Sequence, residues 1–143
     1  MPLPRPEPGL VIYYQYLWRR EHEAGDEQGS KRRPCAIIVA TADQNGRIET
    51  VVAPITHREP LPPAGGIEIP RRVKRYLGLD DQRSWVVATD LNVFEWPGVD
   101  VYPVPNSVPA TFEYGYLPPA LFEKIKAAIR AAGAHQIATR RTE

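Results

Sequence analysis

An Asn-Gly dipeptide between two apolar runs is the feature that most limits the folds open to this chain. Asn45-Gly46 follows the run Pro34–Thr41 and precedes the run Ile48–Ile55. Because Asn-Gly readily adopts the positive φ angles of tight hairpin turns, the pattern predicts that the two runs pair as antiparallel strands. The first run is apolar at nearly every position, which is typical of a strand buried on both faces.

Other short apolar runs predict more strands and two helices around this hairpin. The expected strands are Gly9–Trp18, Ser84–Thr89, Val93–Trp96 and Val99–Val104. Helical spacing of apolar residues predicts a short helix over Pro70–Leu77, with Val73, Tyr76 and Leu77 on one face, and a longer helix over Pro118–Ala132. This order favours a mainly β (α+β) fold, in which a small, strongly curved antiparallel sheet or barrel packs against a C-terminal helix.

The composition fits one globular domain. The chain has 143 residues, of which 43% are apolar and 24% charged. We expect an extended proline-rich lead-in over residues 1–8, the domain over 9–133 and a flexible tail over 134–143, with a long solvated loop at Arg19–Arg33. One cysteine, Cys35, and the lack of a long apolar segment favour a cytoplasmic protein without membrane contact.

Five short motifs resemble those of the MazF/PemK family of endoribonuclease toxins. They occur in the family's order over residues 9–132 and are Gly9-Leu10-Val11-Ile12-Tyr13, Glu27 to Val39 with its Arg33-Pro34 step, Val51-Val52-Ala53-Pro54-Ile55-Thr56, Thr89-Asp90-Leu91-Asn92 and Gly115 to Leu121. No single motif is specific, so the resemblance depends on their order and spacing. The chain departs from the family pattern in its longer first loop, in the Pro60–Gly66 and Tyr102–Glu113 segments and at His57, where a small polar residue is common.

The resemblance implies a fold, an activity and partners. The family fold is an SH3-like barrel with a terminal helix, usually a homodimer. The implied activity is cleavage of single-stranded RNA without a metal or cofactor, which inhibits growth until a small, partly disordered antitoxin binds the toxin. In this resemblance Arg33 and Thr56 match the family's catalytic arginine and threonine, and Glu27 matches an acidic residue of the first loop.

The chemistry of the implied reaction explains why these residue types matter. Attack of a ribose 2′-OH on the adjacent phosphorus needs a base, an acid and a cation for the developing negative charge. Arg33 can supply the cation with a planar set of donors, and Thr56 can orient the phosphate or the 2′-OH. Pairing through the Asn45-Gly46 turn brings the start of one strand beside the end of the other, so we expect Arg33 and Thr56 to share a cleft.

Further polar residues are weaker candidates. His57 is a candidate acid or base because histidine titrates near neutral pH. The candidates for RNA contact are Lys31, Arg32, Asp90, Arg71 and Arg72. Each residue also has a structural interpretation, such as a solvated arginine, a strand-end threonine, an incidental histidine, a turn-forming aspartate or the outer face of a short helix. We expect Cys35 to be a buried strand residue, and no cysteine–histidine cluster has the spacing of a metal site.

Two other functions stay open from the sequence alone. The same barrel can serve as a non-catalytic module that binds protein or nucleic acid, or as an orphan relative without an antitoxin. The net charge of +1 favours these alternatives, because any RNA-binding surface must then come from local clustering of charge.

Overall fold

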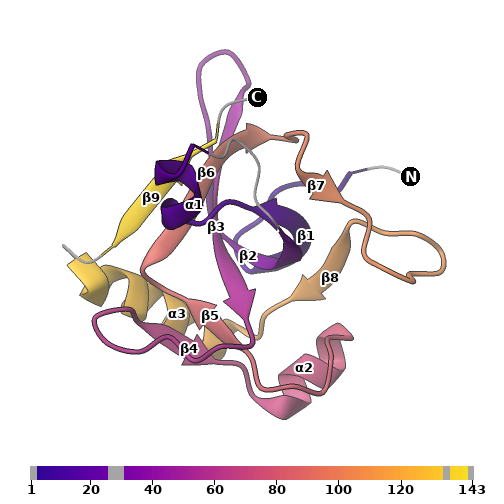
Figure 1. Cartoon of the computed structure of the whole chain (residues 1–143). Coiled ribbons are helices and arrows are strands. Elements are labelled where there is room, and N and C mark those ends of the chain that lie inside the picture. The colour runs from indigo at the N-terminus through magenta and orange to yellow at the C-terminus, as the bar shows by residue number, and fades with distance from the viewer. Residues whose placement is uncertain (1–2, 26–30, 134–135, 142–143) are drawn as a thin grey trace.

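The computed structural model describes residues 3–25, 31–133 and 136–141, and these form a mainly antiparallel β structure with helices at its margins (Figure 1). The strands are β1 (Leu10–Tyr16), β2 (Lys31–Ala42), β3 (Ile48–Thr56), β4 (Gly66–Glu68), β5 (Trp85–Val87), β6 (Asp90–Trp96), β7 (Val101–Tyr102), β8 (Glu113–Tyr116) and β9 (Ile137–Arg140). The helices are α1 (Arg19–Glu23), α2 (Arg71–Leu77) and α3 (Pro119–Ala132).

The predicted hairpin is confirmed as the β2–β3 pair. The Asp43 carboxylate accepts hydrogen bonds from the backbone N–H groups of Asn45 (2.8 Å) and Arg47 (2.9 Å), and Gly46 has the positive φ of 79° that the turn requires. The strands then pair in antiparallel register from Ala42 and Ile48 back to Cys35 and Pro54, and their connecting loop projects from one end of the molecule (Figure 1).

Strand β3 divides its free edge between two neighbours, which bends the sheet. Residues Ile48–Val52 pair with β6, and Ile55 and Thr56 pair with β5. On the other side of β2, strand β1 likewise divides its outer edge between β7 and β8. The mainly antiparallel β fold is therefore confirmed, and the described strands form a sheet that does not close.

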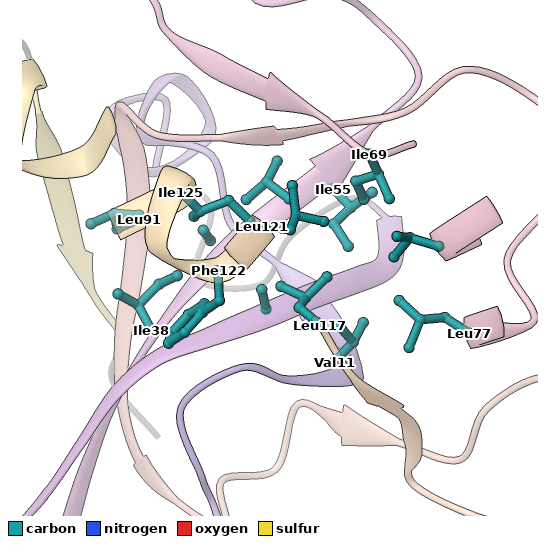
Figure 2. Packing of buried hydrophobic residues seen from close by; sticks show 14 residues of the cluster. Val11, Ile38, Ile55, Ile69, Leu77, Leu91, Leu117, Leu121, Phe122 and Ile125 are labelled. Carbon is teal, nitrogen blue, oxygen red and sulfur yellow. The ribbon is translucent and has the colours of Figure 1, made fainter. Parts of the chain in front are cut away.

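The first of two cores lies between the sheet and α3. Leu121, Phe122 and Ile125 of α3 are buried against it, and Leu77 reaches the same cluster from α2 (Figure 2). Full burial of each such side chain stabilises the fold by about 1.5–3 kcal/mol. Tyr76 is 74% exposed, so the expectation that it shares the buried face of α2 is wrong.

The second core lies on the opposite face of β2. Tyr14 stacks on Phe94 with 4.7 Å between ring centroids, and Cys35 and Ile37 pack into the same cluster. Successive β2 residues therefore point into different cores, as predicted for a strand buried on both faces. Burial raises the pKa of the Cys35 thiol, which keeps it protonated, in agreement with a structural role.

The structure corrects the predicted loop at Arg19–Arg33. Helix α1 occupies Arg19–Glu23, where the Glu21 carboxylate accepts a hydrogen bond from the Trp18 N–H (3.0 Å), and β2 already begins at Lys31. Helix α1 and the first three residues of β2 (Lys31–Arg33) consist mainly of charged residues, which gave no periodic apolar signal.

The structure also corrects the predicted flexible tail over 134–143. Strand β9 pairs in parallel with β6, from Asp90 opposite Ile137 to Val93 opposite Arg140, and Arg141 is buried beyond it (Figure 1). Strand β8 is a further element that the sequence did not predict, at the end of the segment Tyr102–Glu113. These strands are short, and their partners are distant in sequence.

Candidate functional site

A cleft of about 1300 Å³ opens at the end of the β2–β3 hairpin where β2 begins and β3 ends. Its walls come from the segment after β3, from the connection between α2 and β5, and from the turn into β6. Clefts that bind small ligands usually have volumes of about 300–1,000 Å³. The space is therefore sufficient for a ligand larger than one typical small molecule.

Arg33 and Thr56 both line this cleft. The β2–β3 register pairs Cys35 with Pro54, so its continuation by two residues on each strand places Arg33 opposite Thr56 on the same face. Both residues therefore line the same cleft, at the end of the hairpin where they were expected. The Thr56 hydroxyl accepts a hydrogen bond from the backbone N–H of Arg58 (3.2 Å), which leaves its own proton available to a ligand.

The Arg33 guanidinium is held in place by an aromatic ring. Its central carbon lies 5.2 Å from the centroid of the Trp18 ring, and its Nε is buried with no hydrogen-bond partner among the described residues. None of the ion pairs found in the described part of the chain involves Arg33. Within residues 3–25, 31–133 and 136–141, its charge is therefore not neutralised by a carboxylate and can bind an anion.

Positive charge is concentrated around the cleft. Among the described lining residues, six cationic side chains (Arg20, Lys31, Arg32, Arg33, Arg58 and Lys74) face three acidic ones (Glu59, Asp80 and Asp90). The cleft lining therefore has a surplus of three positive charges, whereas the whole chain has a net charge of +1. The cleft is therefore more cationic than the chain as a whole, which favours anionic ligands.

A second polar group occupies one wall of the cleft. His57 Nε2 lies 2.6 Å from Asp80 Oδ2, and the Lys74 ammonium lies 2.5 Å from Asp80 Oδ1. Burial alone would raise the pKa of Asp80, but hydrogen bonds from Lys74 and the Gln82 N–H, with the charges of Lys74 and His57, outweigh burial and lower it. The Asp80 carboxylate therefore stays ionised.

Asp90 lies on the cleft wall near Trp18. Its carboxylate accepts hydrogen bonds from the Tyr16 hydroxyl (2.6 Å) and the Arg19 N–H (3.3 Å). Burial raises the pKa of Asp90, and these hydrogen bonds and the charges of Arg19 and Arg20 offset only part of that effect. Asp90 is the first residue of β6, and its hydrogen bonds join that strand to the end of β1.

Aromatic side chains supply flat surfaces in the cleft. Tyr13, Trp18 and Tyr114 line it, and the Tyr13 and Tyr114 rings meet edge to face with 6.4 Å between centroids. Tyr14 and Tyr16, by contrast, are fully buried in the core. Tyr13, Trp18 and Tyr114 are half-buried, and aromatic rings beside cationic groups are typical of single-stranded nucleic-acid binding.

The remaining candidates divide between the cleft, another surface and the undescribed part of the chain. Lys31 and Arg32 line the cleft, and the Arg32 guanidinium lies 3.6 Å from the Tyr102 ring centroid. Arg71 and Arg72 are exposed on α2 and do not line the cleft, so the expectation that they join the same RNA-binding site gains no support. Glu27 lies outside the described residues.

Sequence reasoning missed Lys74, Asp80 and Ser84. Lys74 belongs to the basic run Arg71–Arg75, for which RNA contact and the outer face of a short helix were both open, yet it is buried and donates to the Ser84 hydroxyl (2.7 Å) as well as to Asp80. Its position three residues before the buried Leu77 places it on the same helix face, and that spacing was the available signal.

The described residues contain no cluster of three potential metal-ligating side chains and no helix long and apolar enough to cross a membrane. No family model and no curated protein matches the sequence.

Proposed function

We propose that this protein is a divergent MazF/PemK-like endoribonuclease that cuts single-stranded RNA without a metal ion. The observation that carries the proposal is that Arg33 and Thr56, from the neighbouring strands β2 and β3, both line one large cationic cleft. These two residues also match the family's catalytic arginine and threonine in the sequence resemblance.

The proposed reaction uses the RNA's own 2′-hydroxyl as nucleophile. The 2′ oxygen forms a bond to the adjacent phosphorus, and the bond from that phosphorus to the 5′ oxygen of the next nucleotide breaks. The 2′ proton passes to a base and the 5′ oxygen gains a proton, so the products carry a 2′,3′-cyclic phosphate and a 5′-hydroxyl. Arg33 stabilises the extra negative charge on the pentacoordinate phosphorus, and the Thr56 hydroxyl donates a hydrogen bond to a phosphate oxygen.

The cleft surface supports RNA as the substrate class. The surplus of cationic side chains suits a phosphate backbone, and Tyr13, Trp18 and Tyr114 can stack against unpaired bases. Stacking is worth about 1–3 kcal/mol per base and requires bases that are not already paired in a duplex. The substrate is therefore single-stranded, and only RNA carries the attacking hydroxyl.

The family resemblance extends the proposal to fold and partners. The curved sheet corresponds to an open form of an SH3-like barrel, and the protein acts in the cytoplasm as a homodimeric growth inhibitor. A small, partly disordered antitoxin would cover the cleft. Light scattering on the purified protein tests the dimer, and relief of growth arrest by a co-expressed acidic peptide tests the antitoxin.

The direct test is cleavage of a labelled single-stranded RNA by the purified chain in the presence of EDTA. We expect fragments ending in a cyclic phosphate by mass spectrometry, and no cleavage at a nucleotide whose 2′-OH is replaced by hydrogen. Arg33→Ala and Thr56→Val each lower the rate of cleavage by a large factor, whereas Arg71→Ala, which changes an exposed residue outside the cleft, does not. RNA that is bound but left intact by the wild-type protein would instead support the non-catalytic binding module.

A further inference from the structure

His57 follows Thr56 directly and occupies the wall of the cleft, with 45% of its side chain exposed. Its Nε2 lies 2.6 Å from Asp80 Oδ2. Because an ionised carboxylate can only accept, Nε2 carries the proton, and in the neutral ring Nδ1 is the nitrogen with the free lone pair. The contact with Asp80 therefore fixes both the ring's orientation and its tautomer.

Asp80 is itself anchored on the side away from His57. Its Oδ1 accepts hydrogen bonds from Lys74 Nζ (2.5 Å) and from the backbone N–H of Gln82 (3.1 Å). Lys74 is buried and also donates to the Ser84 hydroxyl and to the Gln82 carbonyl oxygen. One carboxylate oxygen is thus held by the protein interior, and the other is directed at the imidazole.

Exposure distinguishes this chain of contacts from a purely structural ion pair. The Lys74 side chain is 5% exposed, whereas those of Asp80 and His57 are 47% and 45% exposed. This series of contacts, from Lys74 through Asp80 to His57, therefore runs from the protein interior to the cleft surface. A nucleophile or base oriented by a second polar group, which a third group holds, is a recurrent arrangement in enzymes.

We propose that His57 is the general base of the RNA-cleaving reaction, and that Asp80 and Lys74 are the positioning residues that hold it. This inference rests on the proposed function. Besides Asp80, the carboxylates that line the cleft are Glu59 and Asp90, and both oxygens of Asp90 already accept hydrogen bonds, from Tyr16 and the Arg19 N–H. His57 is the group with a nitrogen left for the substrate.

The proton balance of the step is simple. Nδ1 of neutral His57 takes the proton of the 2′-OH as the 2′ oxygen attacks phosphorus, and the resulting imidazolium is stabilised by the Asp80 carboxylate. The 5′ oxygen takes a proton from water as its bond to phosphorus breaks. The hydroxide that forms then accepts the proton from the imidazolium, which returns the ring to its neutral form.

The test compares kcat and KM for RNA cleavage by the full chain and its variants. His57→Ala lowers kcat by about 10²–10⁴-fold, the usual contribution of a general acid or base, and leaves KM near the wild-type value. Added imidazole restores part of the kcat of His57→Ala and none of the kcat of Arg33→Ala. Asp80→Asn and Lys74→Met lower kcat without changing KM, and Lys74→Arg retains more activity than Lys74→Met.

Circular dichroism and thermal unfolding establish that each variant is folded. If His57→Ala does not fold, His57→Gln, which keeps a hydrogen-bond donor, replaces it in the test. Unchanged kcat in the folded His57 variants, with cleavage still dependent on Arg33, overturns this inference and leaves the proposed function standing. Absence of imidazole rescue in a folded His57→Ala with low kcat also overturns it. Absence of RNA cleavage by the wild-type chain overturns both.

Discussion

Two buried cations have opposite surroundings in this molecule. Arg141 lies near the C-terminus with its side chain 1% exposed, and its partner Asp100 is 5% exposed. Lys74 is 5% exposed, but its partner Asp80 is 47% exposed and contacts His57 in the cleft. The fully buried Arg141–Asp100 pair can act only within the fold, whereas the buried Lys74 holds an Asp80 that a ligand in the cleft can reach.

The Arg141 site ties the end of the chain to the second core. Its guanidinium donates to Asp100 Oδ2 (2.6 Å), to the Gln15 carbonyl oxygen (2.8 Å) and to Asn92 Oδ1 (3.3 Å). These groups belong to β1, to β6 and to the segment before β7. Arg141 therefore joins three distant segments and holds β9 against β6.

The first prediction concerns Arg141, for which the largest loss of stability is expected. Arg141→Met leaves Asp100 as a buried charge without its partner, which costs about 3–5 kcal/mol of the free energy of unfolding. Denaturant unfolding measures this change. Arg140→Met is the matched control, because Arg140 pairs with Glu49 (2.7 Å) on the exposed surface and such pairs contribute only about 0–1 kcal/mol. Equal losses in the two variants would contradict the structural role of Arg141.

The second prediction tests whether the unpaired charge of Asp100 causes the loss of stability in Arg141→Met. Combining Arg141→Met with Asp100→Leu removes both charges, so we expect the double variant to be more stable than Arg141→Met alone. The measurement is again denaturant unfolding. A double variant that loses the sum of two large single losses would show that other contacts of these residues dominate.

Lys74→Met should have an intermediate effect on stability. The loss of Lys74 leaves the Ser84 hydroxyl oxygen without its donor and the Gln82 carbonyl oxygen with only the Ser84 hydroxyl as donor, at about 1–3 kcal/mol. Asp80 remains hydrated because nearly half of its side chain is exposed. The loss in denaturant unfolding is therefore smaller than for Arg141→Met, and a larger loss would contradict the comparison of the two sites.

The smallest effect is expected for Asp80→Asn, and it depends on pH. The folded state lowers the pKa of Asp80, so its ionised form stabilises the fold above the ordinary value of about 3.9 and this stabilisation is lost as pH falls through the folded-state pKa. Near neutral pH the variant loses less than about 1 kcal/mol, as an exposed ion pair implies. Thermal unfolding of both proteins between pH 7 and 3 should show the difference shrinking.

Asp100 should affect the pH dependence of stability in the direction opposite to that of Asp80. Burial raises its pKa, and Arg141 offsets only part of that effect, so ionisation of Asp100 costs stability as pH rises through the unfolded-state value. The stability difference between the wild type and Asp100→Asn should therefore change with pH in the direction opposite to that for Asp80→Asn. The same direction for both variants would contradict the assignment of these two carboxylates.

The sequence predicted the parts of the molecule that depend on local signals. The turn at Asn45-Gly46 predicted the β2–β3 pairing that brings the start of β2 beside the end of β3, but not the one-residue register shift between Ile37 and Val39. Apolar periodicity predicted α2 and α3 within a few residues. Strands β8 and β9 escaped prediction because their stability comes from pairing with distant strands, and short polar segments give no periodic pattern.

The polar networks were the least predictable part of the site. The contact of His57 with Asp80 spans 23 residues and that of Arg141 with Asp100 spans 41, and neither pair has a sequence motif. Lys74 lies in a run of basic residues that gave no sign of burial, although its spacing from Leu77 places it on the buried face of α2. Long-range pairing of charges depends on the tertiary fold, which a single sequence does not specify locally.

The most direct measurement of the central claim is a double-mutant cycle on RNA cleavage with Arg33→Ala, Thr56→Val and the combined variant. Residues that act together on one phosphate have strongly non-additive effects. We predict that the combined variant loses about as much kcat/KM as the more damaging single change. Losses that multiply would contradict a shared phosphate site, and full activity in all three variants would contradict the nuclease function of this cleft.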